Sequence, residues 1–452
     1  MQKKNMPRWK VFLAILSLLL TILIWQRGLQ ESFDRPSVTP KLALNQREIA
    51  LLAYPSLPNS ISPLLVGEDP ELGLKNTLRE LDQGQTGNRE RLLLATLAIS
   101  EDEKRSLLAD TFQEKDLNTV RETLLDSLDQ KDNFQILIDR IQDQQSDPLL
   151  YRMSCLAIGG EPDICVDERV SRNMAFRLLF SQLLPLLAIL MGLLLFLRQG
   201  WLYLRNANSP WPEINFLPLS TVDMVLLIAG GFVVLGELVS PLIAMPFSDL
   251  ITREIASPVK ESLKVLIGYA AMTVPPLIIL RQQISHLRIK VLSMEWLQWG
   301  GRSFAKSAVD ALKGWLMVMP FVLLVSWLTT LFFGDPGGSN PLLDMVLSSK
   351  NYSALSILLI TTVVMAPLFE ELIFRGVLLP ALVKKQGRVL SVLVSALIFA
   401  LAHLSVGEMP PLFVLGIGLA LLRLSSGRLL PCVLMHSLWN GVTFANLLIL
   451  SA

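Results

Sequence analysis

The feature that most constrains the fold of this chain is a series of nine apolar stretches, each close to the length of a membrane-spanning helix. A helix needs about 20 predominantly apolar residues to cross the hydrocarbon core of a bilayer. Apolar residues make up 52% of the 452-residue chain, which is enough for several such helices. We therefore predict an all-α polytopic membrane protein with about nine transmembrane helices, at residues 11–26, 177–197, 222–245, 264–280, 312–333, 357–383, 389–404, 411–424 and 429–450.

Basic residues are concentrated in every second loop between these stretches. Residues 3–10 contain four of them, whereas residues 405–410 contain none. Cytoplasmic loops carry an excess of Lys and Arg, so the pattern predicts a cytoplasmic N-terminus and a C-terminus on the opposite side. The first stretch ends without a small-x-small cleavage motif, and we expect residues 1–26 to be an uncleaved membrane anchor. The host membrane would be a bacterial-type plasma membrane, or a thylakoid or other organellar membrane.

Residues 27–173 are predicted to form a helical, extracytoplasmic soluble domain inserted between the first two spans. Short amphipathic helices are indicated, one of them by the capping box from Ser100 to Glu103. Cys155 and Cys165 lie ten residues apart in this domain. A disulfide between them is compatible with an oxidising compartment. No combination of residues in this domain indicates catalysis.

The remaining chain is divided by its expected role. Residues 174–309 are predicted to contain transmembrane helices and an interfacial loop, in which Trp296 and Trp299 indicate a helix at the membrane surface. Residues 310–452 carry the charged and polar residues within apolar stretches, and we predict that they form an intramembrane catalytic core.

Two adjacent carboxylates and a guanidinium interrupt the apolar stretch 357–383. Each charge near the middle of a span costs roughly 3 kcal/mol on insertion scales, so three on one helix need an explanation. Glu371 and Arg375 are four residues apart and can neutralise each other. Glu370 has no such partner and projects about 100° away from Glu371. Either the set is a structural ion pair beside a protonated carboxyl, or Glu370 is a functional group.

Two of the three histidines, His403 and His436, lie in later apolar stretches. Glu370 and His403 are each 16 residues from the turn at Gln386 and Gly387, so an antiparallel hairpin would place them at the same depth. His436 lies only nine residues after Gly427. Straight helices would therefore leave it roughly 10 Å nearer the cytoplasm than Glu370.

These residue types suit peptide hydrolysis without a covalent intermediate. Glu370 can act as a general base for water, which His403 can help to hold. His436 and Asn440, one helical turn apart, can donate hydrogen bonds to a developing oxyanion. This mechanism requires no cofactor. The alternative is a divalent metal such as zinc bound by Glu370, His403 and His436, although the sequence lacks His-Glu-x-x-His.

Three motifs resemble those of the CAAX protease and bacteriocin-processing (CPBP, or Abi) family of glutamate-type intramembrane endopeptidases, which includes the Ras-converting prenyl endopeptidases. The motifs are Glu370-Glu371-x-x-x-Arg375, Phe399-x-x-x-His403 and His436-x-x-x-Asn440. The resemblance covers about residues 310–450 and leaves residues 27–173 outside the family core.

The resemblance implies an endopeptidase that hydrolyses peptide bonds in membrane-associated or prenylated-type substrates, in a cavity that opens toward the cytoplasm. It implies that Glu370 activates water with His403 and that His436 and Asn440 stabilise the oxyanion. By the same resemblance, three further residues support the site: Glu371, Arg375 and Phe399.

Two other functions fit the same sequence features. The chain could be a non-proteolytic membrane partner or a bacteriocin-immunity protein with the same fold. It could also be a transporter with a Glu and His proton relay, although no internal repeat or pair of broken helices is evident. The expected partners are a peptide or lipid-modified protein substrate and the lipid bilayer. The net charge of +1 is uninformative, and no basic block indicates nucleic acid.

Overall fold

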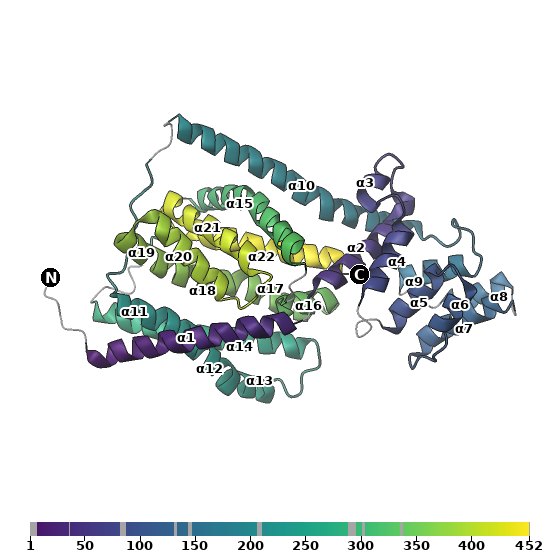
Figure 1. Ribbon diagram of the computed structural model, residues 1–452, viewed down its shortest axis with the longest axis horizontal. Coiled ribbons are helices and arrows are strands. Elements are labelled where there is room, and N and C mark those ends of the chain that lie inside the picture. The colour runs from purple at the N-terminus through teal and green to yellow at the C-terminus, as the bar shows by residue number, and fades with distance from the viewer. Residues whose placement is uncertain are drawn as a thin grey trace. The chain divides into compact units, whose positions relative to one another are not determined.

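The computed structural model describes residues 7–35, 37–81, 87–130, 133–142, 147–205, 210–287, 295–300, 303–334 and 338–451. Across these residues the regular secondary structure is helical and no β-strand occurs, which confirms the predicted all-α fold (Figure 1). The chain divides into two compact units: unit 1 comprises Met1–Val38 and Leu186–Leu448, and unit 2 comprises Thr39–Pro185 and Ile449–Ala452.

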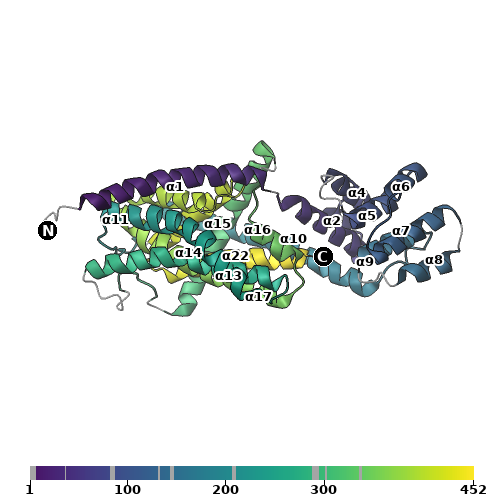
Figure 2. The same ribbon diagram turned by 90° about the horizontal axis from the view of Figure 1, so that it is seen from below.

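Unit 1 is a bundle of long apolar helices that run roughly parallel or antiparallel to one another (Figures 1 and 2). In its interior α21 packs against both α15 and α20, while α14 packs against η3 and α17. The helices that belong wholly to unit 1 are α1 (Arg8–Asp34), α11 (Thr221–Val225), η3 (Leu226–Leu235), α12 (Gly236–Val239), η4 (Ser240–Ala244), α13 (Met245–Ile251), α14 (Val259–His286), α15 (Phe304–Phe333), α16 (Pro341–Ser348), α17 (Tyr352–Leu359), η6 (Ile360–Met365), α18 (Ala366–Glu371), η7 (Leu372–Leu378), α19 (Leu379–Gln386), α20 (Arg388–Leu401) and α21 (Met409–Ser426).

Eight of the described helical segments are long and apolar enough to cross a membrane, and they coincide with eight of the nine predicted stretches. The chain is thus an integral membrane protein by helix length and composition. The one predicted stretch that does not coincide with such a segment, at 389–404, forms the shorter helix α20, which has 14 residues. At about 1.5 Å per residue α20 is too short to span the bilayer core alone. The first predicted stretch is longer than expected, because α1 continues to Asp34.

The segment Tyr352–Gln386 is one of these eight spans and changes its helical form along its length. The π-helical stretches η6 and η7 lie on either side of the α-helical turn α18. Pro367 stands at the beginning of α18 and cannot donate a backbone hydrogen bond, which explains a departure from regular α-helix there. Short π-helical stretches frequently occur at functional sites.

The main apolar core of unit 1 surrounds this irregular segment. Phe369, Phe374 and Phe399 are buried in it. The rings of Phe374 and Phe399 meet edge to face at 5.4 Å between centroids, an arrangement that aromatic pairs prefer. Helices that are far apart in sequence are therefore joined around the charged residues of α18 and η7.

Residues 295–300 form a turn rather than the predicted interfacial helix. Gln298 has a φ of 50°, which does not continue a right-handed helix. The carbonyls of Gln298 and Trp299 accept hydrogen bonds from the backbone of Leu429 and Leu430, at 3.1 and 2.9 Å. The turn is therefore tied to the beginning of α22 (Leu430–Leu450) instead of lying free at a membrane surface. Residues 288–294, in the same predicted loop, lie outside the described part of the chain.

Unit 2 is a small helical domain with its own apolar core. Its Cys155 and Cys165 form a disulfide. The predicted cap is present, since the Ser100 side chain accepts a hydrogen bond from the backbone of Glu103. Its helices are α2 (Thr39–Ala53), η1 (Tyr54–Ser56), α3 (Ser62–Val66), α4 (Pro70–Glu80), α5 (Asn88–Leu97), α6 (Glu101–Leu107), α7 (Lys115–Leu128), α8 (Phe134–Ile141) and α9 (Pro148–Ala157), with the first part of α10 (Glu168–Leu204) and the last residues of α22 (Leu430–Leu450).

Candidate active site

The two adjacent glutamates of α18 have different surroundings. Glu371 is fully buried, and its Oε1 accepts a hydrogen bond from Nη1 of Arg375 at 2.9 Å. This is the ion pair expected from the four-residue spacing. Arg375 is also fully buried, and its guanidinium lies over the ring of Phe399, 4.3 Å from the centroid. The Glu371 face of α18 is therefore neutralised inside the apolar core.

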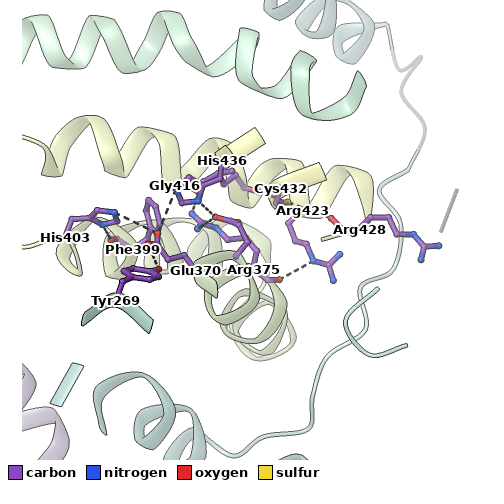
Figure 3. Close-up of polar contacts among 12 residues, drawn as sticks. Tyr269, Glu370, Arg375, Phe399, His403, Gly416, Arg423, Arg428, Cys432 and His436 are labelled. Carbon is purple, nitrogen blue, oxygen red and sulfur yellow. Dashed lines mark hydrogen bonds and ion pairs between the residues drawn. The ribbon is translucent and has the colours of Figure 1, made fainter. Parts of the chain in front are cut away.

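Glu370 points toward a polar cluster formed by Tyr269, His403 and His436, shown in Figure 3. Its Oε1 accepts a hydrogen bond from Oη of Tyr269 at 3.2 Å. Its Oε2 lies 4.0 Å from Nε2 of His403 and 3.9 Å from Nε2 of His436. The Glu370 and His403 side chains keep 13% and 25% of their surface exposed, so the cluster is not fully enclosed by protein.

The backbone fixes the tautomer of His403. Nδ1 of His403 lies 2.8 Å from the carbonyl oxygen of Phe399, one turn earlier on α20. A carbonyl oxygen only accepts hydrogen bonds, so we infer that Nδ1 carries the proton. In the neutral ring Nε2 then presents a lone pair toward Glu370.

The second glutamate orients His436. Nδ1 of His436 lies 2.9 Å from Oε1 of Glu371, the oxygen that also binds Arg375. With Nδ1 donating to this carboxylate, Nε2 is directed at Glu370. Nε2 donates a hydrogen bond only when the ring is protonated on both nitrogens.

The ring of Phe399 separates these polar groups from the apolar core. It packs against His403 at 4.8 Å and against His436 at 5.7 Å between ring centroids. The buried ring of Phe399 thus packs against both imidazoles, and its carbonyl oxygen also accepts a hydrogen bond from His403.

Asn440 lies one turn after His436 on α22 but is held by a different neighbour. Its Nδ2 donates a hydrogen bond to the carbonyl oxygen of Thr362 in η6, at 2.8 Å. Within the described part of the chain, no hydrogen bond joins Asn440 to Glu370, His403 or His436. One amide hydrogen of Asn440 is thus committed to the backbone carbonyl of Thr362, and the side chain has a second amide hydrogen to donate.

The loop that follows His403 is anchored by the end of the N-terminal helix. Nη2 of Arg35 donates to the carbonyl oxygen of Leu404, and Oγ of the buried Ser32 accepts a hydrogen bond from the backbone of Val406 at 3.0 Å. Leu404 has a φ of 50°, uncommon for a residue other than glycine. These contacts hold the loop in a conformation that it would not adopt alone.

A short segment before α16 completes this anchor. Oγ of Ser405 donates to the carbonyl oxygen of Gly338 at 2.7 Å, and Glu408 accepts from the backbone of Asn340 at 3.0 Å. Gly338 in turn donates its backbone N–H to the carbonyl oxygen of Arg35. Three distant parts of the chain therefore meet beside His403.

Comparison with known protein families agrees with this geometry. Residues 352–442 match the family described as type II CAAX prenyl endopeptidase Rce1-like. This segment belongs to the CAAX protease family. The resemblance predicted from the three motifs is confirmed, and all of the proposed site residues from Glu370 to Asn440 lie within the matched segment.

The other comparisons add no activity. Residues 39–176 match a family described as a domain of unknown function (DUF8675). No curated protein and no solved structure matches the chain significantly. The CAAX protease match thus supports a peptidase at the level of the family, for one segment of the chain.

The CAAX protease segment does not supply the whole cluster. Tyr269 lies on α14, and Ser32 and Arg35 lie at the end of α1 or just after it, all outside residues 352–442. Sequence reasoning missed all three, because no local pattern distinguishes them from other polar residues near helix ends or within spans.

The depth expected for His436 was wrong. The straight-helix estimate left it about 10 Å from the level of Glu370, whereas Nε2 of His436 lies 3.9 Å from Oε2 of Glu370. Between Glu370 and Gln386 the chain passes through the π-helical η7, whose wider turns advance less per residue than an α-helix.

The chemistry of the cluster partly suits a metal ion, but its spacing does not. A carboxylate and two Nε2 lone pairs are zinc-type ligands, and each imidazole has the outer hydrogen bond that metal-binding histidines usually make. However, the described residues include no group of three His, Cys, Asp or Glu side chains spaced to hold a metal ion. We therefore derive no reaction step through a metal bound by Glu370, His403 and His436.

Proposed function

We propose that this protein is an intramembrane endopeptidase in which Glu370 activates a water molecule for direct attack on a peptide bond. The proposal rests chiefly on one observation: Oε2 of Glu370 lies 3.9–4.0 Å from Nε2 of both His403 and His436. Polar atoms at such separations are commonly bridged by water. A water molecule here would be in contact with a base and with oriented imidazoles.

The attack uses Glu370 and His403 together. Water donates one hydrogen bond to Oε2 of Glu370 and the other to Nε2 of His403. These two bonds direct a lone pair of the water oxygen at the substrate carbonyl carbon. As the C–O bond forms, Oε2 of Glu370 takes the proton. No side chain forms a bond to the substrate, so no acyl-enzyme intermediate is involved.

The oxyanion is stabilised from α22. His436 donates from Nε2 in its doubly protonated form, while the carboxylate of Glu371 accepts the hydrogen bond from Nδ1. The remaining amide hydrogen of Asn440 is the second donor. When the C–N bond breaks, the proton on Glu370 passes to the leaving nitrogen, which gives a carboxylic acid and an amine.

The proposed substrates are membrane-associated or prenylated-type proteins, cleaved near the membrane. This class follows the description of the matched family. The membrane-spanning segments that carry the cluster support it, because a lipid anchor would keep a substrate beside the site. The proposed partners are accordingly a peptide or lipid-modified protein and the bilayer.

The test is cleavage by the purified full-length protein of peptides with and without a prenyl group, read by mass spectrometry. Glu370→Gln should abolish cleavage, since the amide cannot accept a proton, and should leave the protein folded. The matched control is Glu237→Gln, which makes the same change at an exposed glutamate of α12. Cleavage retained by Glu370→Gln would overturn the mechanism. Tight binding of a membrane protein without cleavage would instead support the non-proteolytic partner.

A further inference from the structure

Tyr269 reaches Glu370 from a helix outside the CAAX protease segment. It lies near the middle of α14, about 100 residues before the glutamate, and donates its hydroxyl hydrogen to Oε1 at 3.2 Å. Its ring stands edge to face with Phe369, at 6.4 Å between centroids and 88° between planes. Packing on the residue next to Glu370 fixes the direction of the hydroxyl.

This hydrogen bond distinguishes the two oxygens of the carboxylate. Oε1 of Glu370 is occupied by Tyr269, whereas buried Oε2 accepts no hydrogen bond from any described residue. Oε2 is also the oxygen that faces both Nε2 atoms. The last torsion of a glutamate side chain is broad and roughly two-fold, so a free carboxylate would rotate and offer either oxygen in many directions.

We propose that Tyr269 is a positioning residue for the glutamate base: its hydroxyl holds one oxygen of Glu370 and thereby directs the other at His403 and His436. This inference rests on the proposed function of Glu370. Tyr269 keeps its proton throughout, because the proton from water goes to Oε2 and then to the leaving nitrogen. The fixed carboxylate enters the reaction already aligned, which lowers the entropic part of the barrier.

The position of Tyr269 also makes α14 part of the active site. α14 packs against α17, which is the first part of the membrane-spanning segment that carries Glu370. A shift of α14 along or away from that span would withdraw the hydroxyl from Oε1. Catalysis by the CAAX protease segment therefore depends on a helix that this segment does not contain.

The experiment compares three variants of the full-length protein in the cleavage assay. Tyr269→Phe removes only the hydroxyl. A hydrogen bond to a charged group contributes enough energy for a loss of roughly 10- to 100-fold in kcat, and KM should change little. Tyr269→4-aminophenylalanine restores a donor at the same place and should recover most of the lost rate. Tyr352→Phe makes the same change at an exposed tyrosine and should behave as wild type.

The outcomes separate this inference from the proposed function. If wild type cleaves, Glu370→Gln does not, and Tyr269→Phe keeps the wild-type kcat, the positioning role is wrong and the glutamate mechanism stands. If Tyr269→Phe loses activity together with thermal stability, and 4-aminophenylalanine restores neither, Tyr269 acts through packing alone and the inference is likewise wrong. If Glu370→Gln retains full activity, both proposals are overturned.

Discussion

Glu371 and His436 are joined by a 2.9 Å contact between Oε1 and Nδ1, although 65 residues separate them in the chain. The same carboxylate oxygen binds Arg375, so Glu371 connects a buried ion pair to one of the two imidazoles that face Glu370. Adjacent glutamates thus carry out two different tasks. Glu371 pairs with Arg375 and orients His436, whereas Glu370 faces the partly exposed cluster where substrate would bind.

This division predicts opposite phenotypes for the same substitution at neighbouring positions. Glu371→Gln leaves the fully buried Arg375 without a charged partner, and we expect the free energy of unfolding to fall by about 3 kcal/mol. Glu370→Gln removes no ion pair with Arg375 and leaves a partly buried amide that still accepts a hydrogen bond from Tyr269, so it should unfold near the wild-type temperature. Thermal unfolding in detergent measures both. Equal destabilisation by the two changes would contradict the distinction.

The contacts of α1 predict a catalytic effect of a helix far from the three motifs. Arg35→Ala removes the bond to the Leu404 carbonyl and should loosen the loop after His403. We expect a drop of roughly tenfold in kcat, because small displacements of reacting groups are costly, and faster hydrogen exchange in residues 402–408. Arg27→Ala is the matched control, since Arg27 is exposed and pairs with Glu31, one helical turn later on α1. Unchanged exchange in Arg35→Ala would show that Arg35 does not hold the loop.

The sequence predicted the helices well because lipid imposes a length and a composition on each span. It also predicted the pairing of Glu371 with Arg375, a local contact between successive turns of one helix. The three motifs placed Glu370, His403 and His436 in one site, and the structure brings these side chains together. The catalytic roles assigned to them stay predictions.

What the sequence could not supply are contacts between helices. The hydrogen bonds from Tyr269 to Glu370 and from His436 to Glu371 depend on how α14 and α22 pack against the Glu370 span. The pattern of apolar residues along the sequence does not specify this packing. The level of His436 was missed for a related reason. Spacing along straight α-helices ignores π-helical stretches such as η7 and the reach of long side chains.

The predicted orientation in the membrane can be tested on a single span. Tyr352 and Gln386 are exposed and stand at opposite ends of the segment Tyr352–Gln386. In intact cells or vesicles, a membrane-impermeant thiol reagent should label Gln386→Cys only from the cytoplasmic side and Tyr352→Cys only from the other side, as the basic loops indicate. The free cysteine of the native chain, Cys432, is buried and should not react. The reverse labelling pattern would place unit 2 in the cytoplasm.

The last prediction separates oxyanion stabilisation by side chains from polarisation by a metal ion. In the water-only mechanism Asn440→Ala should lower kcat by roughly 10²–10³, with a smaller change in KM, because the lost donor acts mainly in the transition state. The double variant with His436→Ala should cost less than the product of the two single losses, since both donors serve one oxygen. If a metal polarised the carbonyl instead, Asn440 would matter little, and His403→Ala would release the ion.

Single-turnover cleavage by the wild type and these variants measures the losses in rate. Elemental analysis of the purified proteins measures whether a metal ion is bound and whether His403→Ala releases it. The structure already limits what Asn440 can do, because one of its amide hydrogens is committed to the Thr362 carbonyl. Thr362→Val keeps that carbonyl and serves as the control for a side-chain change at the same contact. A stoichiometric metal that disappears in His403→Ala, combined with near-normal turnover in Asn440→Ala, would replace the water-only mechanism with a metal-assisted one.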